Sequence, residues 1–388
     1  MSKKNNTFCI APWVQIVLRT NKKIGPCCIL QSPHTINDMS ISEYYNSDWN
    51  QQIKEDMLSG NAISGCKDCY RNEELGYPSM RQDLNRDYKI VKTDLADKIL
   101  SYFKYDQLNY PSRLELHISN ICNLKCLTCQ PEDSSAFLTE TSKIRNIPIS
   151  NLDYQLSQDK INNLLSDITE RNIDILDLRG GESMMIPKIK NILLEKNVSN
   201  IRELRIQTNG TVYDDTWGEI FSKFEKVEVH LSIDAYDKDN HYIRYPAEWS
   251  LIESTVTKLK KIPNVNLCLN TVVSNLNLLV LPTLFDWAIK NNISVHLTTL
   301  FYPEIYRYTN LPQKLLTKSL NEISKYSEKF NEEHILNQIT ALVNHNISNL
   351  DLWEDFCIEV SQRDNYRNNS IFKILPQLTE YWTDAKKA

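Results

Sequence analysis

Hydrophobic and polar positions follow one repeating pattern from residue 113 to about residue 300. Short runs rich in apolar and β-branched residues are each followed by a polar or glycine-containing loop and then by helical spacing, the pattern of βα units on a parallel sheet. The pattern predicts six strands, Arg113–Ile118, Ile173–Leu178, Ile201–Gln207, Val227–Ile233, Val265–Val273 and Ile293–Leu300. Six such units indicate an α/β fold with a partial (β/α)6 TIM-like barrel, in which function lies at the carboxyl ends of the strands.

The sequence on either side of this region has a different pattern. The first hundred residues carry cysteines in short turns, and the last eighty contain two helical patterns, Lys314–His345 and Leu350–Gln362. A chain of 388 residues also exceeds the usual size of one domain. We therefore expect an N-terminal domain over residues 1–108, the barrel over 109–305 and a helical C-terminal cap over 306–388.

Composition limits the class of partner. The formal net charge of -5 gives no basic surface for a phosphate backbone, so general nucleic-acid binding is not expected. No apolar stretch reaches the length that spans a bilayer, and the first residues resemble no signal segment. We expect a cytoplasmic protein that does not bind membranes, whose cysteines are reduced thiols or metal ligands rather than disulfides.

Three cysteines form a C-x3-C-x2-C cluster just after the first predicted strand, at Cys122, Cys126 and Cys129. A structural zinc or a cubane iron-sulfur cluster takes four ligands, so a three-thiolate set indicates an iron left open for a small molecule. The alternatives are buried thiols in a core, or a zinc site completed elsewhere in the chain.

A second set of cysteines precedes the barrel. It comprises Cys9, the neighbours Cys27 and Cys28, and the pair Cys66 and Cys69, so five thiols are available for four ligand positions. This spacing fits a zinc ribbon as well as a cubane cluster. The remaining two cysteines, Cys268 and Cys357, lie among apolar residues and are predicted to belong to the core.

Polar and glycine residues mark the ends of the later strands. Gly180, Gly181 and Glu182 follow the second strand and Thr208-Asn209-Gly210 the third; the fourth contributes Ser232 and Asp234, and Arg244 lies beyond it. Each has an ordinary structural explanation, as a turn, a helix cap or a surface charge. Their order along the strand ends favours one shared site.

Together with the three-cysteine cluster, these residues resemble the radical S-adenosylmethionine (SAM) enzymes. The resemblance implies a 4Fe-4S cluster on Cys122, Cys126 and Cys129 whose free iron is chelated by SAM. It also implies that the Gly-Gly-Glu turn contacts the methionine ammonium, that Ser232 and Asp234 bind ribose, and that Arg244 pairs with the methionine carboxylate. Thr128 stands where the family has an aromatic residue beside adenine, which leaves that contact mainly to the backbone.

The N-terminal cysteines resemble the twitch or SPASM-type module that binds an auxiliary 4Fe-4S cluster in such enzymes, although that module normally follows the barrel. The resemblance implies Cys9, Cys66 and Cys69 as ligands, with Cys27 narrowly preferred over Cys28 as the fourth. A cluster held by four cysteines would act as an electron conduit.

The resemblance implies reductive cleavage of SAM to a 5'-deoxyadenosyl radical that abstracts hydrogen from a peptide or small molecule, with a flavodoxin or ferredoxin as electron donor. Enzymes with such a module often modify peptides. The alternatives are a non-catalytic scaffold that binds zinc or SAM, and SAM-dependent group transfer.

Overall fold

The computed structural model describes residues 7–74, 79–88, 110–149, 156–330 and 333–382. Its central feature is one open eight-stranded sheet in the order β2-β1-β3-β4-β5-β6-β7-β8. The strands are β1 (Gln15–Leu18), β2 (Ile24–Gly25), β3 (Arg113–His117), β4 (Ile173–Arg179), β5 (Ile201–Thr208), β6 (Lys226–Leu231), β7 (Val265–Val273) and β8 (Ser294–Thr299).

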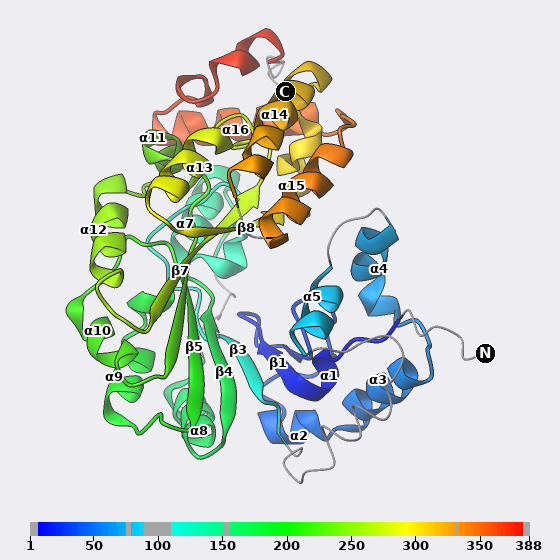
Figure 1. The fold of residues 1–388 in the computed structure, drawn as a ribbon, viewed down its shortest axis with the longest axis vertical. Coiled ribbons are helices and arrows are strands. Elements are labelled where there is room, and N and C mark those ends of the chain that lie inside the picture. The colour runs from blue at the N-terminus through cyan, green and yellow to red at the C-terminus, as the bar shows by residue number, and fades with distance from the viewer. Residues whose placement is uncertain (1–6, 75–78, 89–109, 150–155, 331–332, 383–388) are drawn as a thin grey trace.

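Strands β3 to β8 are parallel neighbours in chain order, which confirms the six predicted strands and the α/β partial-barrel class. Helices connect them and cover the outer side of the sheet, as Figure 1 shows for α9, α10, α12 and α13. These connecting helices are α7 (Ser135–Arg145), α8 (Gln158–Thr169), α9 (Pro187–Glu195), α10 (Asp215–Phe221), α11 (Asp237–Ile243), α12 (Trp249–Leu259) and α13 (Leu281–Lys290).

Alternation along the strands separates an apolar face from a polar one. In β6, Val227, Val229 and Leu231 are fully buried, while the intervening Glu228 and His230 keep part of their surface exposed. Successive side chains of a strand point to opposite faces, so the apolar set packs under the outer helices. The polar set is left on the inner face of the sheet.

The N-terminal segment contributes to the same sheet. Strand β1 pairs in parallel with β3, with Gln15 opposite Arg113, and β2 pairs antiparallel with β1. Around these strands lie α1 (Ala11–Val14), α2 (Ile41–Tyr45), α3 (Asp48–Leu58), α4 (Lys67–Glu74) and α5 (Met80–Asp87). The expected boundary at residue 108 lies outside the described residues, and the division into domains 1–108, 109–305 and 306–388 stays a prediction.

The C-terminal segment packs beside β8 as helices α14 (Gln313–Ser324), α15 (Glu333–Asn344) and α16 (Trp353–Arg367). The helical pattern predicted over Lys314–His345 is thus interrupted by a 3-10 turn at Lys325–Glu328. There Tyr326 and Phe330 turn inward and pack edge-on against Phe285 of α13. None of the described helices is both long and apolar enough to cross a membrane.

Candidate active site

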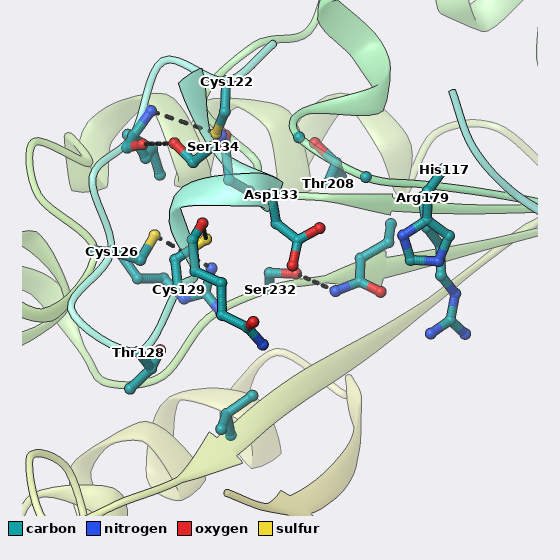
Figure 2. A pocket seen from close by; sticks show the side chains of 18 residues that line it. His117, Cys122, Cys126, Thr128, Cys129, Asp133, Ser134, Arg179, Thr208 and Ser232 are labelled. Carbon is teal, nitrogen blue, oxygen red and sulfur yellow. Dashed lines mark hydrogen bonds between the residues drawn. The ribbon is translucent and has the colours of Figure 1, made fainter. Parts of the chain in front are cut away.

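The three cysteines of the C-x3-C-x2-C cluster lie in the loop after β3 and line one cavity of about 320 Å³. Figure 2 shows Cys122, Cys126 and Cys129 close together on one side of it, with Thr128 and Ser232 nearby. Further residues predicted from the sequence line the same cavity, namely Gly180, Gly181 and Arg244. Because strands β3 to β6 run parallel, their carboxyl ends bring these distant residues to one place.

The cysteine loop is held by backbone pairing. The amide of Lys125 donates to the carbonyl of Tyr245 at 2.6 Å, and the amide of Leu127 donates to the carbonyl of Ile243 at 2.9 Å. On the other side, the hydroxyl of Ser134 donates to the carbonyl of Leu124 at 2.7 Å and caps α7. The cysteine loop is therefore held on both sides by contacts with other segments of the fold.

The thiols of this loop are all free. Burial raises the pKa of Cys122 to about 12 and raises the pKa of Cys126 and Cys129, although the Arg244 guanidinium acts in the opposite direction on Cys126. Within the described ranges, no group of three or more histidine, cysteine or acidic side chains is arranged to hold a single metal ion. The donor set of three unpaired thiols on one cavity fits an iron-sulfur cluster with one open iron, whose binding would displace the thiol protons.

The Gly-Gly turn after β4 is shaped by its contact with the cysteine loop. Gly180 and Gly181 have φ of +83° and +52°, a region that glycine occupies readily. A Cβ on Gly180 would lie 2.9 Å from the Cβ of His117, and one on Gly181 would overlap the carbonyl of Ile121. The glycines are thus required by the close approach of two protein segments, a reason that the sequence does not reveal.

Glu182 is fully buried directly behind this turn. Its carboxylate accepts hydrogen bonds from the Asn209 amide at 2.6 Å, the Thr208 hydroxyl at 2.7 Å and the Met184 amide at 3.1 Å. Burial raises the pKa of Glu182 to about 7 despite these donors. In this structure Glu182 joins the end of β4 to the end of β5, and its predicted contact with the SAM ammonium stays a prediction.

Asp234 and Arg244 form a buried ion pair beside the cysteines. The Nε of Arg244 donates to Oδ2 of Asp234 at 2.7 Å, and the Val272 amide donates to Oδ1 at 2.9 Å. The Nη1 of Arg244 lies 3.8 Å from the sulfur of Cys126. Asp234 therefore lies behind Arg244 and aims its guanidinium at the cavity, and its predicted contact with the ribose stays a prediction. Ser232 lines the cavity and accepts a hydrogen bond from Gln207 at 3.0 Å.

Several residues that line this cavity were not identified from the sequence. His117, Arg179 and Gln207 come from the ends of β3, β4 and β5. Their shared signal is a polar side chain at the end of an apolar strand, the place where a parallel sheet positions functional groups.

A second cavity of about 390 Å³ lies along the inner face of β4 to β8 and shares Arg179 with the first. Its two arginines are paired with carboxylates. Arg179 donates to Asp177 at 3.0 Å, and Arg205 contacts Glu228 at 3.3 Å. The β7 and β8 side contributes neutral polar groups, including Asn270 and Thr298.

Cys268 also lines this second cavity and is half-buried, so its assignment to the core was wrong. The two-residue period of β7 places it on the inner face with Asn270. Cys357, by contrast, is fully buried in the core as predicted.

A third and larger space, a groove of about 1140 Å³, runs between α4 and the segment that follows β8. Phe301 and Tyr302 line it and are 47% and 63% exposed. Charged residues of both signs, including Arg71 and Glu304, complete its walls.

The N-terminal cysteines form a separate group. Cys9, Cys27, Cys66 and Cys69 surround a small apolar pocket of about 20 Å³. The sulfur of Cys28 instead lies 3.3 Å from that of Met80, exposed and away from the other four. This grouping places Cys27 rather than Cys28 with the other predicted ligands. That these four bind a cluster stays a prediction.

Comparison with known proteins identifies the class of the central region. Residues 116–291 match the Radical SAM superfamily. This segment contains the three-cysteine loop and strands β4 to β7, so the central region of the chain is similar to the radical SAM superfamily.

Curated relatives match only part of the chain. GTP 3',8-cyclase of Lactiplantibacillus plantarum is 28% identical over 110 residues, and that of Limosilactobacillus fermentum is 26% identical over 110 residues. Each match covers 28% of this chain and 29% of the relative, less than a third of either protein.

Similar solved structures include anSMEcpe with bound AdoMet, at 20% identity and a TM-score of 0.41, covering 63% of this chain and 64% of that one. Streptococcus suis SuiB bound to S-adenosylmethionine matches at 16% identity and a TM-score of 0.40, covering 74% of this chain and 60% of that one.

Proposed function

We propose that this protein reductively cleaves SAM and uses the resulting 5'-deoxyadenosyl radical to abstract hydrogen from a substrate. The observation that carries this proposal is the convergence of three free thiols and the Arg244 guanidinium on one cavity at the strand ends. When bound there, a cluster with one open iron supplies the electron that cleaves SAM to methionine and the radical.

The residues around the cavity would hold and orient SAM. Arg244, fixed by Asp234, offers its guanidinium to the methionine carboxylate, because a guanidinium binds a carboxylate with two hydrogen bonds. Ser232 and the neighbouring Gln207 offer polar groups to the ribose, and Thr128 lies on the wall assigned to adenine. Gly180 and Gly181 bring the turn close to the cysteine loop, so that the ammonium group would meet the backbone of the turn, and its contact with the buried Glu182 would require the turn to open.

The substrate would enter from the second cavity, because Arg179 lies on the walls of both spaces. Its arginines are already neutralised by carboxylates, so a triphosphate such as that of GTP would have to displace those ion pairs. The neutral groups of β7 and β8 suit an uncharged polar group. This favours a substrate class different from the GTP named for the curated relatives.

A peptide is the substrate class that the groove favours. Its volume of about 1140 Å³ exceeds the roughly 300–1,000 Å³ of typical small-molecule sites. Its exposed aromatic side chains, Phe301 and Tyr302, offer contact area to an extended chain. We therefore propose a peptide-modifying enzyme, with a small-molecule substrate as the alternative.

The four N-terminal cysteines would hold an auxiliary 4Fe-4S cluster that passes electrons. Four thiols around one apolar pocket leave no position for a substrate, which is the arrangement expected of a conduit. The electron donor would be a flavodoxin or ferredoxin.

The test is anaerobic reconstitution with iron and sulfide, then addition of dithionite and SAM. Wild-type protein should release methionine and 5'-deoxyadenosine, Cys126→Ala should release neither, and the matched control Cys28→Ser should match the wild type. Methylated or aminocarboxypropylated product would support group transfer. Bound zinc without cleavage would support the scaffold alternative.

A further inference from the structure

The cysteine loop is also held from its outer side by the last long helix of the chain. The Nη2 of Arg367, at the end of α16, donates to the carbonyl of Lys125 at 2.6 Å, one residue before Cys126. Only 2% of this side chain is exposed. A buried guanidinium that binds the loop backbone restricts how far the loop can move.

Arg367 is itself anchored by a buried carboxylate. Glu140 of α7, whose side chain is fully buried, accepts from Nη2 of Arg367 at 2.7 Å and from Nη1 of Arg363 at 2.9 Å. The hydroxyl of Thr141 accepts a further bond from Arg363 at 3.2 Å. Such a network is satisfied only when all members are present, so α16 and α7 fix Arg367 in one orientation.

Two positive charges therefore flank the loop. Arg244 lies on the cavity side, 3.8 Å from the sulfur of Cys126. Arg367 lies on the other side, with its guanidinium 5.0 Å from the centre of the Tyr245 ring. Arg244 thus contacts the thiol of Cys126 itself, and Arg367 contacts the backbone one residue before it.

We propose that Arg367 is a positioning residue that fixes the cysteine loop and places a second positive charge beside Cys126, so that the C-terminal helix helps to set the reduction potential of the first cluster. This inference rests on the proposed function. The potential of an iron-sulfur cluster depends on nearby charge and hydrogen bonding, and substitution of residues that orient the ligands typically changes metal affinity or activity by about 10- to 100-fold. Arg367 contributes both effects without lining the cavity.

The test compares Arg367→Gln and Arg367→Lys with wild-type reconstituted protein. Lysine keeps the charge but offers one ammonium in place of a planar fork, so it cannot bind Glu140 and the Lys125 carbonyl in the same way. The matched control is Arg145→Gln, which removes the partly exposed pair between Arg145 and Glu359 on the same two helices. Each variant is subjected to an anaerobic redox titration that is followed by electron paramagnetic resonance. Only the signal that changes on SAM addition is used, because that signal comes from the cluster with the open iron. Iron loss to a chelator is measured in parallel.

For Arg367→Gln, removal of the charge should lower the ratio of reduced to oxidised cluster roughly tenfold at a fixed potential, equivalent to about 59 mV for one electron. Arg367→Lys should keep nearly the wild-type ratio but lose iron faster, and Arg145→Gln should change neither quantity.

An unchanged ratio and unchanged iron loss in Arg367→Gln would overturn the inference. If that variant does not fold, Arg367→Lys decides the question, because wild-type iron retention in it would also overturn the inference. A wild-type protein without any SAM-responsive signal would instead refute the proposed function.

Discussion

The two cysteine sites differ in how open they are. Three thiols share a cavity of about 320 Å³ with a guanidinium and other polar groups, whereas four thiols surround an apolar pocket of about 20 Å³. Cys9, Cys66 and Cys69 are each less than a tenth exposed. Room and polar groups beside an incomplete ligand set suit the exchange of a small molecule, and a closed apolar shell around a complete set suits a cluster that carries only electrons. We therefore expect the two sites to respond differently to the same substitution.

The largest effect is expected from removing one ligand at each site. Cys126→Ala and Cys66→Ser should each reduce bound iron from about eight to about four atoms per chain, because each variant loses one 4Fe-4S cluster. Only Cys126→Ala should abolish 5'-deoxyadenosine formation in the presence of dithionite. Iron and sulfide analysis measures the bound clusters, and chromatography of the products measures 5'-deoxyadenosine. Loss of SAM cleavage in both variants would show that the second site is needed for more than electron passage.

The next prediction uses the neighbouring cysteines. Cys27→Ser should lose the auxiliary cluster, because Cys27 lies with Cys9, Cys66 and Cys69, and Cys28→Ser should retain it. Visible absorption of the anaerobic protein near the sulfur-to-iron charge-transfer band measures the difference. The reverse result would mean that the loop after β2 rearranges when iron binds.

A smaller effect is expected from the ion pair behind the first site. Asp234→Asn leaves Arg244 without its buried anion, so the guanidinium should lose its fixed direction toward the cavity. Substitution of a residue that orients a binding group typically changes affinity or activity by about 10- to 100-fold. Equilibrium binding of SAM to the reconstituted protein measures this loss. Lys325→Gln, in an exposed ion pair with Glu322 of the C-terminal segment, should bind SAM as the wild type does.

The smallest effect concerns the pH dependence of stability. Burial raises the pKa of Glu182 to about 7, so near pH 6 the folded chain holds a proton that the unfolded chain has released. The free energy of unfolding should therefore fall as pH rises from about 4.3 to about 7, by at most about 1.4 kcal/mol per unit. Glu182→Gln should remove this slope. Denaturant unfolding of the metal-free protein at several pH values measures it, and an unchanged slope in the variant would exclude Glu182 as its source.

The sequence predicted the parallel core of this fold because its strands are long and strongly apolar on one face. It did not predict β1 and β2, since Gln15–Leu18 and Ile24–Gly25 are too short to show alternation. They become strands through pairing with β3, a long-range contact that local patterns cannot reveal.

The sequence likewise predicted only part of the candidate site, because local patterns do not show which strands meet. Spacing and strand position identified Cys122, Cys126, Cys129 and Arg244, which the fold does bring to one cavity. The sequence could not show that Asp234 lies behind Arg244, nor that Glu182 is enclosed by Thr208 and Asn209. Those relations depend on which side chains meet between strands, and no spacing along one strand determines them.

The parallel pairing of β1 with β3 has a consequence for synthesis of the protein. Cys9 and Cys27 lie on either side of β1, whose partner strand is made only after residue 113 has been added. Chains are synthesised from the N-terminus, and non-local strand pairing forms late. Cys9 and Cys27 therefore stay accessible to oxidants and to other metals until β3 has been synthesised and pairs with β1.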